Sequence, residues 1–167
     1  MKTLIVYYSR SGTTRVVARA LAKDLPADIE EIHCNRYARG FSNYLLAVYE
    51  SWKGKRPRID PLAHALSEYE LVVIAGPIWA FRPATPLRTF LTQERIRLRR
   101  VAFLLTHGGT AGDRSLGEMQ QISGHAPVAT LVVREKDVKA NRFAAALSSF
   151  VAELKRFGNA QAMGQRA

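Results

Sequence analysis

The chain has few of the sequence features that stabilise small secreted proteins or anchor proteins in membranes. It has a single cysteine, Cys34, so no internal disulfide can form and no cysteine-rich zinc site is available. Its longest apolar runs, such as Val101–Leu105, are far shorter than the roughly 20 residues that span a bilayer. A strand-like run begins at Thr3 and leaves no room for a signal peptide. We therefore expect a cytoplasmic protein without a metal site or a membrane span.

Acidic residues are scarce relative to basic ones. There are 14 Asp and Glu against 25 Lys and Arg, which gives a formal net charge of +11. Two basic clusters, Lys53–Arg58 and Arg95–Arg100, supply much of it. Two interpretations are open: a solvated basic surface, or attraction to a phosphorylated cofactor, an acidic redox protein or nucleic acid. Nucleic acid is the least favoured partner, because only Trp52 lies beside these clusters as a base-stacking aromatic residue.

Apolar runs of strand length alternate with segments of helical period. The expected strands are Thr3–Tyr8, Asp28–His33, Leu71–Ala75, Val101–Thr106 and Val128–Val133, and the expected helices are Thr14–Leu25, one around Tyr44–Tyr49, Pro86–Leu91, Ser115–Ile122 and Asn141–Phe157. Strands that are apolar on both faces and separated by helices predict an α/β fold with a parallel sheet covered on each side. The expected strand order is 2-1-3-4-5, with ligands at the carboxyl ends of the strands. Residues 1–167 are expected to form a single domain.

Hydroxyl side chains crowd the turn after the first strand. Ser9, Ser11, Thr13 and Thr14 provide four hydroxyls, with Arg10 and Gly12 among them. The next helix begins at this turn, and its unpaired N–H groups and dipole favour a phosphate there. The alternative is a simple helix cap with polar turn residues. Four hydroxyls in six residues exceed what capping requires, so a phosphate site is favoured.

The stretch Val6–Thr14, with Ala18 and Leu21 after it, resembles the FMN-phosphate signature of the flavodoxin family. The resemblance implies a flavodoxin-like three-layer sandwich in which Ser9, Arg10, Ser11, Gly12, Thr13 and Thr14 bind the phosphate of FMN. Arg10 departs from the family pattern, because flavodoxins hold the phosphate without a basic residue.

Two further loops follow from this resemblance. The second loop is implied to cover the flavin ring with Pro77, Ile78, Trp79, Ala80 and Phe81. Trp79 is its stacking candidate, although an indole packed on its own domain is the alternative. The third loop is implied to reach the pyrimidine end of the ring with Thr106, His107, Gly108, Gly109 and Asp113. Unlike the loop of electron-carrier flavodoxins, it has no aromatic residue and a single acid.

The string Thr106–Gly109 also resembles a loop of flavodoxin-like NAD(P)H:quinone oxidoreductases. That resemblance implies a catalytic His107 that donates a proton or hydrogen bond to a quinone-type acceptor. A loop histidine without a catalytic part is an equally open interpretation. Because the presumed site has Arg10, Arg82 and His107 but few acids, we expect it to stabilise a negatively charged reduced flavin better than acidic flavodoxins do.

The function predicted from these features is FMN-dependent redox chemistry, with NAD(P)H as a candidate reductant. A reductase is favoured over an electron carrier, and the acceptor and the oligomeric state, including a homodimer, stay open. One alternative is a flavin-free binding module on the same fold. A receiver domain of that kind needs an acidic cluster where Tyr7, Tyr8, Gly76 and Pro77 stand. The other alternative is a basic nucleic-acid-binding protein.

Overall fold

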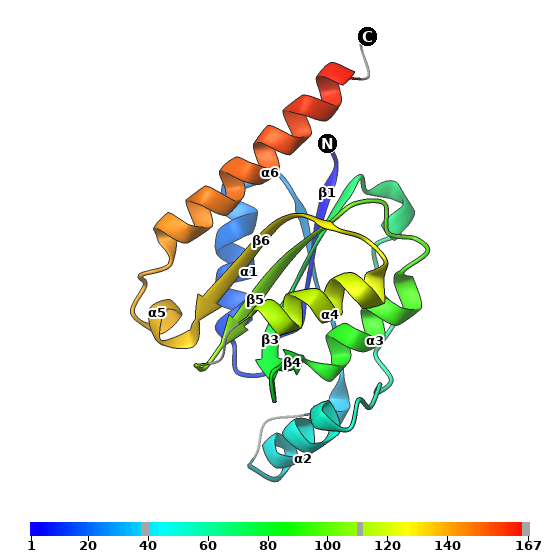
Figure 1. Cartoon of the computed structure of the whole chain (residues 1–167), viewed down its shortest axis with the longest axis vertical. Coiled ribbons are helices and arrows are strands. Elements are labelled where there is room, and N and C mark those ends of the chain that lie inside the picture. The colour runs from blue at the N-terminus through cyan, green and yellow to red at the C-terminus, as the bar shows by residue number, and fades with distance from the viewer. Residues whose placement is uncertain (38–40, 110–111, 165–167) are drawn as a thin grey trace.

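Figure 1 shows the computed structural model of the chain, which describes residues 1–37, 41–109 and 112–164. Five parallel strands form the central sheet: β1 (Thr3–Tyr7), β2 (Asp28–Glu31), β3 (Leu71–Trp79), β5 (Val101–His107) and β6 (Pro127–Arg134). They lie in the order β2-β1-β3-β5-β6. The predicted order 2-1-3-4-5 is therefore confirmed. A short sixth strand, β4 (Arg82–Pro83), pairs antiparallel with β3.

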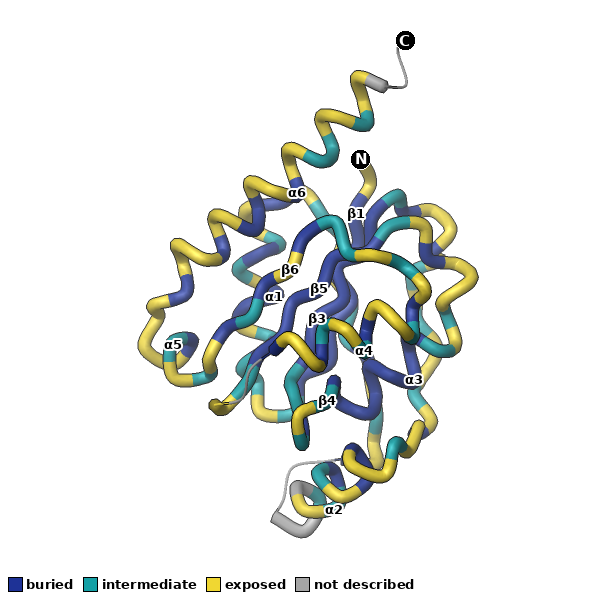
Figure 2. Tube along the Cα trace, in the orientation of Figure 1, coloured by how far each residue is buried: buried dark blue, intermediate teal, exposed yellow. Residues whose placement is uncertain are grey.

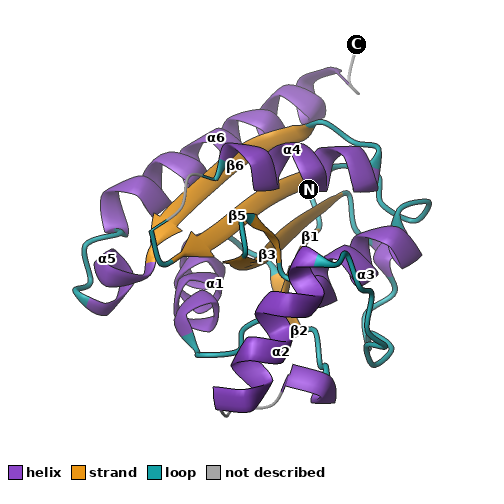
Figure 3. Cartoon of the chain, turned by 60° about the horizontal axis from the view of Figure 1, so that its bottom comes forward, coloured by secondary structure: helices purple, strands orange, loops and turns teal. Residues whose placement is uncertain are grey.

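Helices cover both faces of the sheet (Figures 1 and 3). They are α1 (Thr13–Asp24), α2 (Phe41–Trp52), α3 (Thr85–Glu94), α4 (Asp113–Ser123), α5 (Glu135–Lys139) and α6 (Ala144–Gly164), with 3₁₀ turns at Asn35–Tyr37 and Leu66–Glu68. Helices α1, α5 and α6 pack on one face, and α3 and α4 on the other. Helix α2 lies at the carboxyl end of the sheet and contacts β3, β4 and α3.

The two faces of the sheet have separate apolar cores. Strand β1 divides its residues between them by the two-residue period of a strand. Leu4 packs with Phe90 and Phe103 on the α3–α4 side, whereas Ile5 packs with Phe150 on the α6 side. Whereas the edge strands β2 and β6 are only partly buried, the inner strands β1, β3 and β5 are consequently buried almost throughout their length (Figure 2). This two-sided burial explains why their sequences are continuously apolar instead of alternating.

Several elements differ from the prediction: β2 ends at Glu31 and not at His33, β4 and α5 were not predicted, and α6 continues to Gly164. Strand β3 does not end at Ala75 but continues through Gly76 and Pro77 to Trp79. Its neighbour β1 ends opposite Ala75, so the missing N–H of Pro77 costs no hydrogen bond on that side. The closing helix begins at Ala144 and not at Asn141.

A left-handed turn explains the late start of α6. Asn141 has a φ of 52°, a conformation that cannot continue into a right-handed helix. The short helix α5 precedes this turn and was not predicted. No helix in the described part of the chain is long and apolar enough to cross a membrane.

Candidate functional site

A cavity of about 310 Å³ lies at the carboxyl ends of β1, β3 and β5. All three predicted loops contribute to its lining, as does the start of α5. The lining residues are Arg10, Ser11, Thr13, Pro77, Ile78, Trp79, Thr106, His107, Gly108 and Glu135. We call it the three-loop cavity. It occupies the place where ligands bind in open parallel sheets.

The first loop leaves the N-terminus of α1 open. The cap position is Gly12, which has a φ of 96° and no side chain that could accept a hydrogen bond. Among the N–H groups of Thr13, Thr14 and Arg15, that of Arg15 is the one with an acceptor in the described chain, the Ser9 hydroxyl at 3.2 Å. The N–H groups of Thr13 and Thr14 therefore have donor capacity left. A Cβ on Gly12 would meet no atom within 4 Å, so the space above the turn is open.

The four predicted hydroxyls divide into two pairs. Ser11 and Thr13 line the cavity, with their oxygens 3.2 Å apart. Ser9 and Thr14 are instead buried. The Thr14 hydroxyl lies 2.8 Å from that of Thr106 and thereby joins α1 to β5. The first pair can contact a ligand, and the second pair holds the loop in position.

The second loop forms the turn of a β-hairpin. Trp79 pairs with Arg82, so Ala80 and Phe81 alone connect β3 to β4. The Trp79 indole is buried and makes edge-on contacts with Tyr8 and Tyr37, at ring-centroid distances of 5.6 and 5.4 Å. The indole thus packs on its own domain although Trp79 is among the residues that line the cavity, and stacking on a flavin ring stays a prediction.

Two predicted residues of the second loop lie away from the cavity. Ala80 and Phe81 line a separate groove on the side of α2. Their φ values are 48° and 63°, so both adopt the left-handed conformation of a type I′ hairpin turn, which favours Asn and Gly. The turn therefore places Ala80 and Phe81 at this groove and not at the three-loop cavity, where the sequence predicted them.

The third loop brings His107 into the cavity. Its Nδ1 atom is buried and has no hydrogen-bond partner in the described part of the chain. Burial, together with the nearby charge of Arg134, lowers the pKa of the imidazole below its usual 6.5. His107 is consequently neutral at neutral pH, and its orphaned ring nitrogen is suited to a polar group of a ligand. The prediction that His107 is catalytic is compatible with this placement and stays a prediction.

The rest of the third loop is only partly in the cavity. Thr106 and Gly108 line it, whereas Gly109 and Asp113 are exposed outside it. Residues 110 and 111 of the predicted loop lie outside the described residues. Asp113 is the first residue of α4, so the acid that the sequence placed in this loop belongs to a helix N-terminus.

Sequence reasoning missed Glu135. This residue begins α5 and lines the cavity, and it forms an ion pair of 2.7 Å with Lys139. Its position directly after β6 could have indicated this role, because the carboxyl end of β6 lies at the same edge of the sheet as the cavity. Glu135 and Arg10 are therefore the charged residues that line the cavity. Because His107 is neutral, the site is less basic than its sequence suggested.

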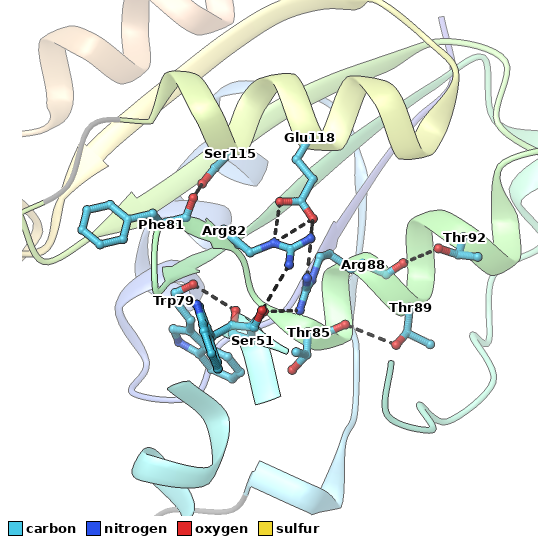
Figure 4. A network of polar contacts seen from close by, with 11 residues as sticks. Ser51, Trp79, Phe81, Arg82, Thr85, Arg88, Thr89, Thr92, Ser115 and Glu118 are labelled. Carbon is cyan, nitrogen blue, oxygen red and sulfur yellow. Dashed lines mark hydrogen bonds and ion pairs between the residues drawn. The ribbon is translucent and has the colours of Figure 1, made fainter. Parts of the chain in front are cut away.

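Arg82 is held away from the cavity by a polar network (Figure 4). Its guanidinium pairs with Glu118 of α4 at 2.6 Å, and Arg88 of α3 approaches the same carboxylate at 3.5 Å. Arg88 is 2% exposed and also donates to the Ser51 carbonyl at 3.0 Å. Ser51 of α2 in turn donates to the Trp79 carbonyl at 2.9 Å. The network thus ties the hairpin to α2, α3 and α4.

The charges of this network also perturb one another. Burial alone opposes ionisation of Glu118, but Arg82 and Arg88 outweigh it and lower the pKa of the carboxyl group. Burial lowers the pKa of Arg88 below its usual range. The ordinary pKa of an arginine is so high that the guanidinium stays charged. Glu118 is therefore an anion shared between two cations.

Comparison with known proteins places this site in context. A family model described as flavodoxin matches residues 2–138. A flavoprotein from Lactobacillus acidophilus NCFM, solved in complex with FMN, is 26% identical with a TM-score of 0.67, covering 86% of this chain and 98% of its own. The apo form of a flavoprotein from that organism gives a TM-score of 0.62 at 26% identity, covering 80% and 91%.

More distant structures share the fold. An NADH:FMN oxidoreductase in its apo form has a TM-score of 0.52 at 16% identity, with 91% of this chain and 89% of that chain covered. No curated protein sequence shows significant similarity to the chain.

Proposed function

This chain belongs to the flavodoxin family, and we propose that it is an FMN-dependent oxidoreductase that uses NAD(P)H to reduce a quinone-type or other small acceptor. The observation that carries the FMN part is the three-loop cavity with an uncapped helix N-terminus at one end. The 26% identical flavoprotein from Lactobacillus acidophilus, solved with FMN, supports the same cofactor.

The residues of the cavity suit the two ends of FMN. At the phosphate end, the free N–H groups of Thr13 and Thr14 and the hydroxyls of Ser11 and Thr13 are the donors. At the ring end, Pro77, Ile78 and Trp79 would supply apolar contact and the Nδ1 atom of His107 a hydrogen-bonding position. When bound, FMN would supply the redox chemistry, and the protein would bind, orient and shield it.

The reductase part rests on the charges of the cavity. Among the described residues that line it, Glu135 is the one acid and Arg10 balances it, whereas a strongly reducing electron carrier surrounds its flavin with acids. A second candidate function is electron transfer to an acidic protein, which the net charge of +11 favours. A cytoplasmic location is also part of the proposal, because a chain with one cysteine suits a reducing compartment.

Anaerobic mixing separates these functions. FMN-loaded protein is mixed with NADPH or NADH, and the absorbance of oxidised flavin is followed, with dithionite as the reference reductant. The proposal predicts full bleaching by a nicotinamide and recovery on addition of menadione. If dithionite bleaches the flavin but neither nicotinamide does, the reductase function is rejected and electron transfer remains the candidate function. Protein that takes up no FMN would reject both.

A further inference from the structure

Helix α2 turns an apolar stripe toward solvent. Leu45, Tyr49 and Trp52 follow the i, i+4, i+7 spacing of one helix face, and they are 53%, 56% and 64% exposed. The buried face holds Ala47 of the apolar core together with the polar residues Glu50 and Ser51. A surface helix normally keeps its apolar residues on the buried face, whereas α2 carries apolar residues on its exposed face as well. Exposed aromatic side chains gathered in this way mark a binding surface.

The hairpin turn supplies the opposite wall. Phe81 is 58% exposed, and its carbonyl accepts a hydrogen bond of 3.1 Å from the Ser115 hydroxyl (Figure 4). Both Ala80 and Phe81 have positive φ, which costs about 1 kcal/mol for each side-chain-bearing residue. Backbone strain of this kind persists where it positions functional groups. Together α2 and the turn enclose a groove of about 640 Å³, which we call the aromatic groove.

Arginines border this groove on one side. Arg82 and Arg114 line the aromatic groove and also a neighbouring cavity of about 720 Å³. Arg56 and Arg95 line that second cavity, so the fold brings one residue from each basic cluster of the sequence to this place. Its acid, Glu118, is already shared between Arg82 and the buried Arg88. Arg114 forms no ion pair with any described residue. The border therefore has a strong excess of positive charge.

The walls of the groove are fixed in place. Ser51 joins α2 to β3 through the Trp79 carbonyl at 2.9 Å, and Arg88 joins α3 to α2 through the Ser51 carbonyl at 3.0 Å. Small-molecule sites are commonly preformed, mostly apolar and a few hundred Å³ in volume, with a few polar groups that orient the ligand. The aromatic groove meets each of these conditions.

We propose that the aromatic groove binds a flat aromatic molecule that carries an anionic substituent, with its rings between Trp52 and Phe81 and its negative charge toward Arg114. An inorganic anion would use the arginines but not the aromatic wall, and an uncharged aromatic molecule would leave the arginines unused. Consecutive hairpin residues line the two sites, with Trp79 in the three-loop cavity and Ala80 in the groove. The proposal concerns binding, and it stands independently of whether FMN is held next door.

Calorimetric titration of the full chain tests the proposal with three probes. These are anthraquinone-2-sulfonate, the uncharged 2-(hydroxymethyl)anthraquinone and inorganic sulfate. We expect the sulfonate to bind on the order of tenfold more tightly than the uncharged probe, since it adds one charge-assisted contact worth about 1.5 kcal/mol. Sulfate should show no measurable binding. Saturation of the protein with FMN should leave the sulfonate affinity unchanged.

Three variants locate the probe. Arg114→Gln should weaken the sulfonate on the order of tenfold and leave the uncharged probe unaffected. Trp52→Ala should weaken both probes, and because Trp52 is 64% exposed, the fold should persist, as circular dichroism can verify. Arg99→Gln removes the same charge from an exposed position before the amino end of β5 and should change neither affinity.

Several results would overturn the proposal. One is the absence of sulfonate binding, and another is an equal effect of Arg114→Gln and Arg99→Gln. Displacement of the sulfonate by FMN would place the probe in the three-loop cavity instead. A dimer in sedimentation that Trp52→Ala converts to monomer would show that a second copy of the chain occupies the groove. Apart from the displacement by FMN, these outcomes do not depend on the success of FMN binding.

Discussion

The three-loop cavity and the aromatic groove lie on neighbouring parts of one hairpin, but they are held by different forces. At the phosphate end of the cavity, six consecutive residues, 9–14, follow a buried strand and start a helix, and the backbone itself supplies the donors. The groove joins α2, the β3–β4 turn and α4, which are separated in the chain and held by ion pairs and hydrogen bonds such as Arg82–Glu118.

Because of this difference, we expect that a substitution can disrupt one of the two regions and leave the other intact. Loss of a charge in the Arg82–Glu118–Arg88 network should loosen the hairpin and groove, since each ion is buried or half-buried and depends on its partner. A change at Ser11 or Thr13 of the phosphate loop should alter ligand affinity while the fold persists, because these side chains line the cavity and are not the pair that holds the loop in position. Four predictions examine this separation.

The largest effect is expected for Glu118→Gln. The variant leaves Arg88, 2% exposed, without a counter-ion, and we expect the free energy of unfolding to fall by about 3 kcal/mol. Urea denaturation measures it. The control is Glu94→Gln, which breaks the 2.8 Å pair with the 62% exposed side chain of Arg97 and should cost less than about 0.5 kcal/mol. Equal losses would mean that burial does not distinguish the two pairs. FMN affinity should change little in either variant.

The second prediction concerns the phosphate loop. Thr13→Asp places a carboxylate beside the expected phosphate, and the FMN affinity should fall about 100-fold, or about 2.7 kcal/mol. Riboflavin, which has no phosphate, should lose less than about threefold. Thr13→Val removes the hydroxyl without adding charge and should give an intermediate loss. Quenching of flavin fluorescence measures all three. Similar losses for FMN and riboflavin would contradict a phosphate site at residue 13.

The third prediction uses pH to examine how α2 is attached. Arg36, at 2.5 Å from Glu50, together with the Tyr37 hydroxyl, lowers the pKa of the Glu50 carboxyl from 4.5 to about 2. The stabilisation is therefore complete above pH 4.5 and is lost as the pH falls toward 2. Since the Arg36 side chain is 52% exposed, the loss should amount to about 1–2 kcal/mol.

Glu50→Gln provides the comparison for this prediction. The difference in unfolding free energy between the natural chain and the variant should shrink between pH 6 and pH 3. A difference that stays constant over this range would show that the pair with Arg36 does not lower the pKa of the Glu50 carboxyl group.

The smallest effect is expected at the hairpin turn. Replacing Ala80-Phe81 by Asn-Gly suits the positive φ values of both positions and should stabilise the protein by about 1 kcal/mol. The same change removes Phe81 from the groove, so binding of anthraquinone-2-sulfonate should weaken. Thermal unfolding and calorimetry measure the two effects. A gain in stability without a loss of binding would show that neither the strained turn nor the Phe81 side chain contributes to binding in the aromatic groove.

Most of the fold could be predicted from the sequence because its signals are local. The apolar runs of β1, β3 and β5 mark buried strands, and the order of the sheet follows from the alternation of strands and helices. The end of β3 could not be predicted, because Pro77 is tolerated only where β1 has already ended. The α5–α6 junction depends on a left-handed Asn141, which no apolar period signals.

The candidate site likewise contains some features that local sequence patterns predict and others that they do not. The place of Ser11, Thr13 and His107 in the lining of the cavity could be predicted because each lies in a predicted loop that comes directly after a predicted strand. The hairpin could not be recognised, because Ala-Phe is an unfavourable pair for a type I′ turn. The pairing of Arg82 with Glu118, 36 residues later in the chain, is likewise invisible to local patterns. Contacts between distant segments, and not the chemistry of single residues, set this limit.

The most direct test of the account is a titration of the apoprotein with FMN and, separately, with riboflavin. The open N-terminus of α1 predicts that one FMN binds per chain and that riboflavin binds about 100-fold more weakly, since the phosphate contacts account for about 2.7 kcal/mol. If the apoprotein binds no FMN, or binds FMN and riboflavin with equal affinity, the assignment of residues 9–14 to the phosphate is wrong.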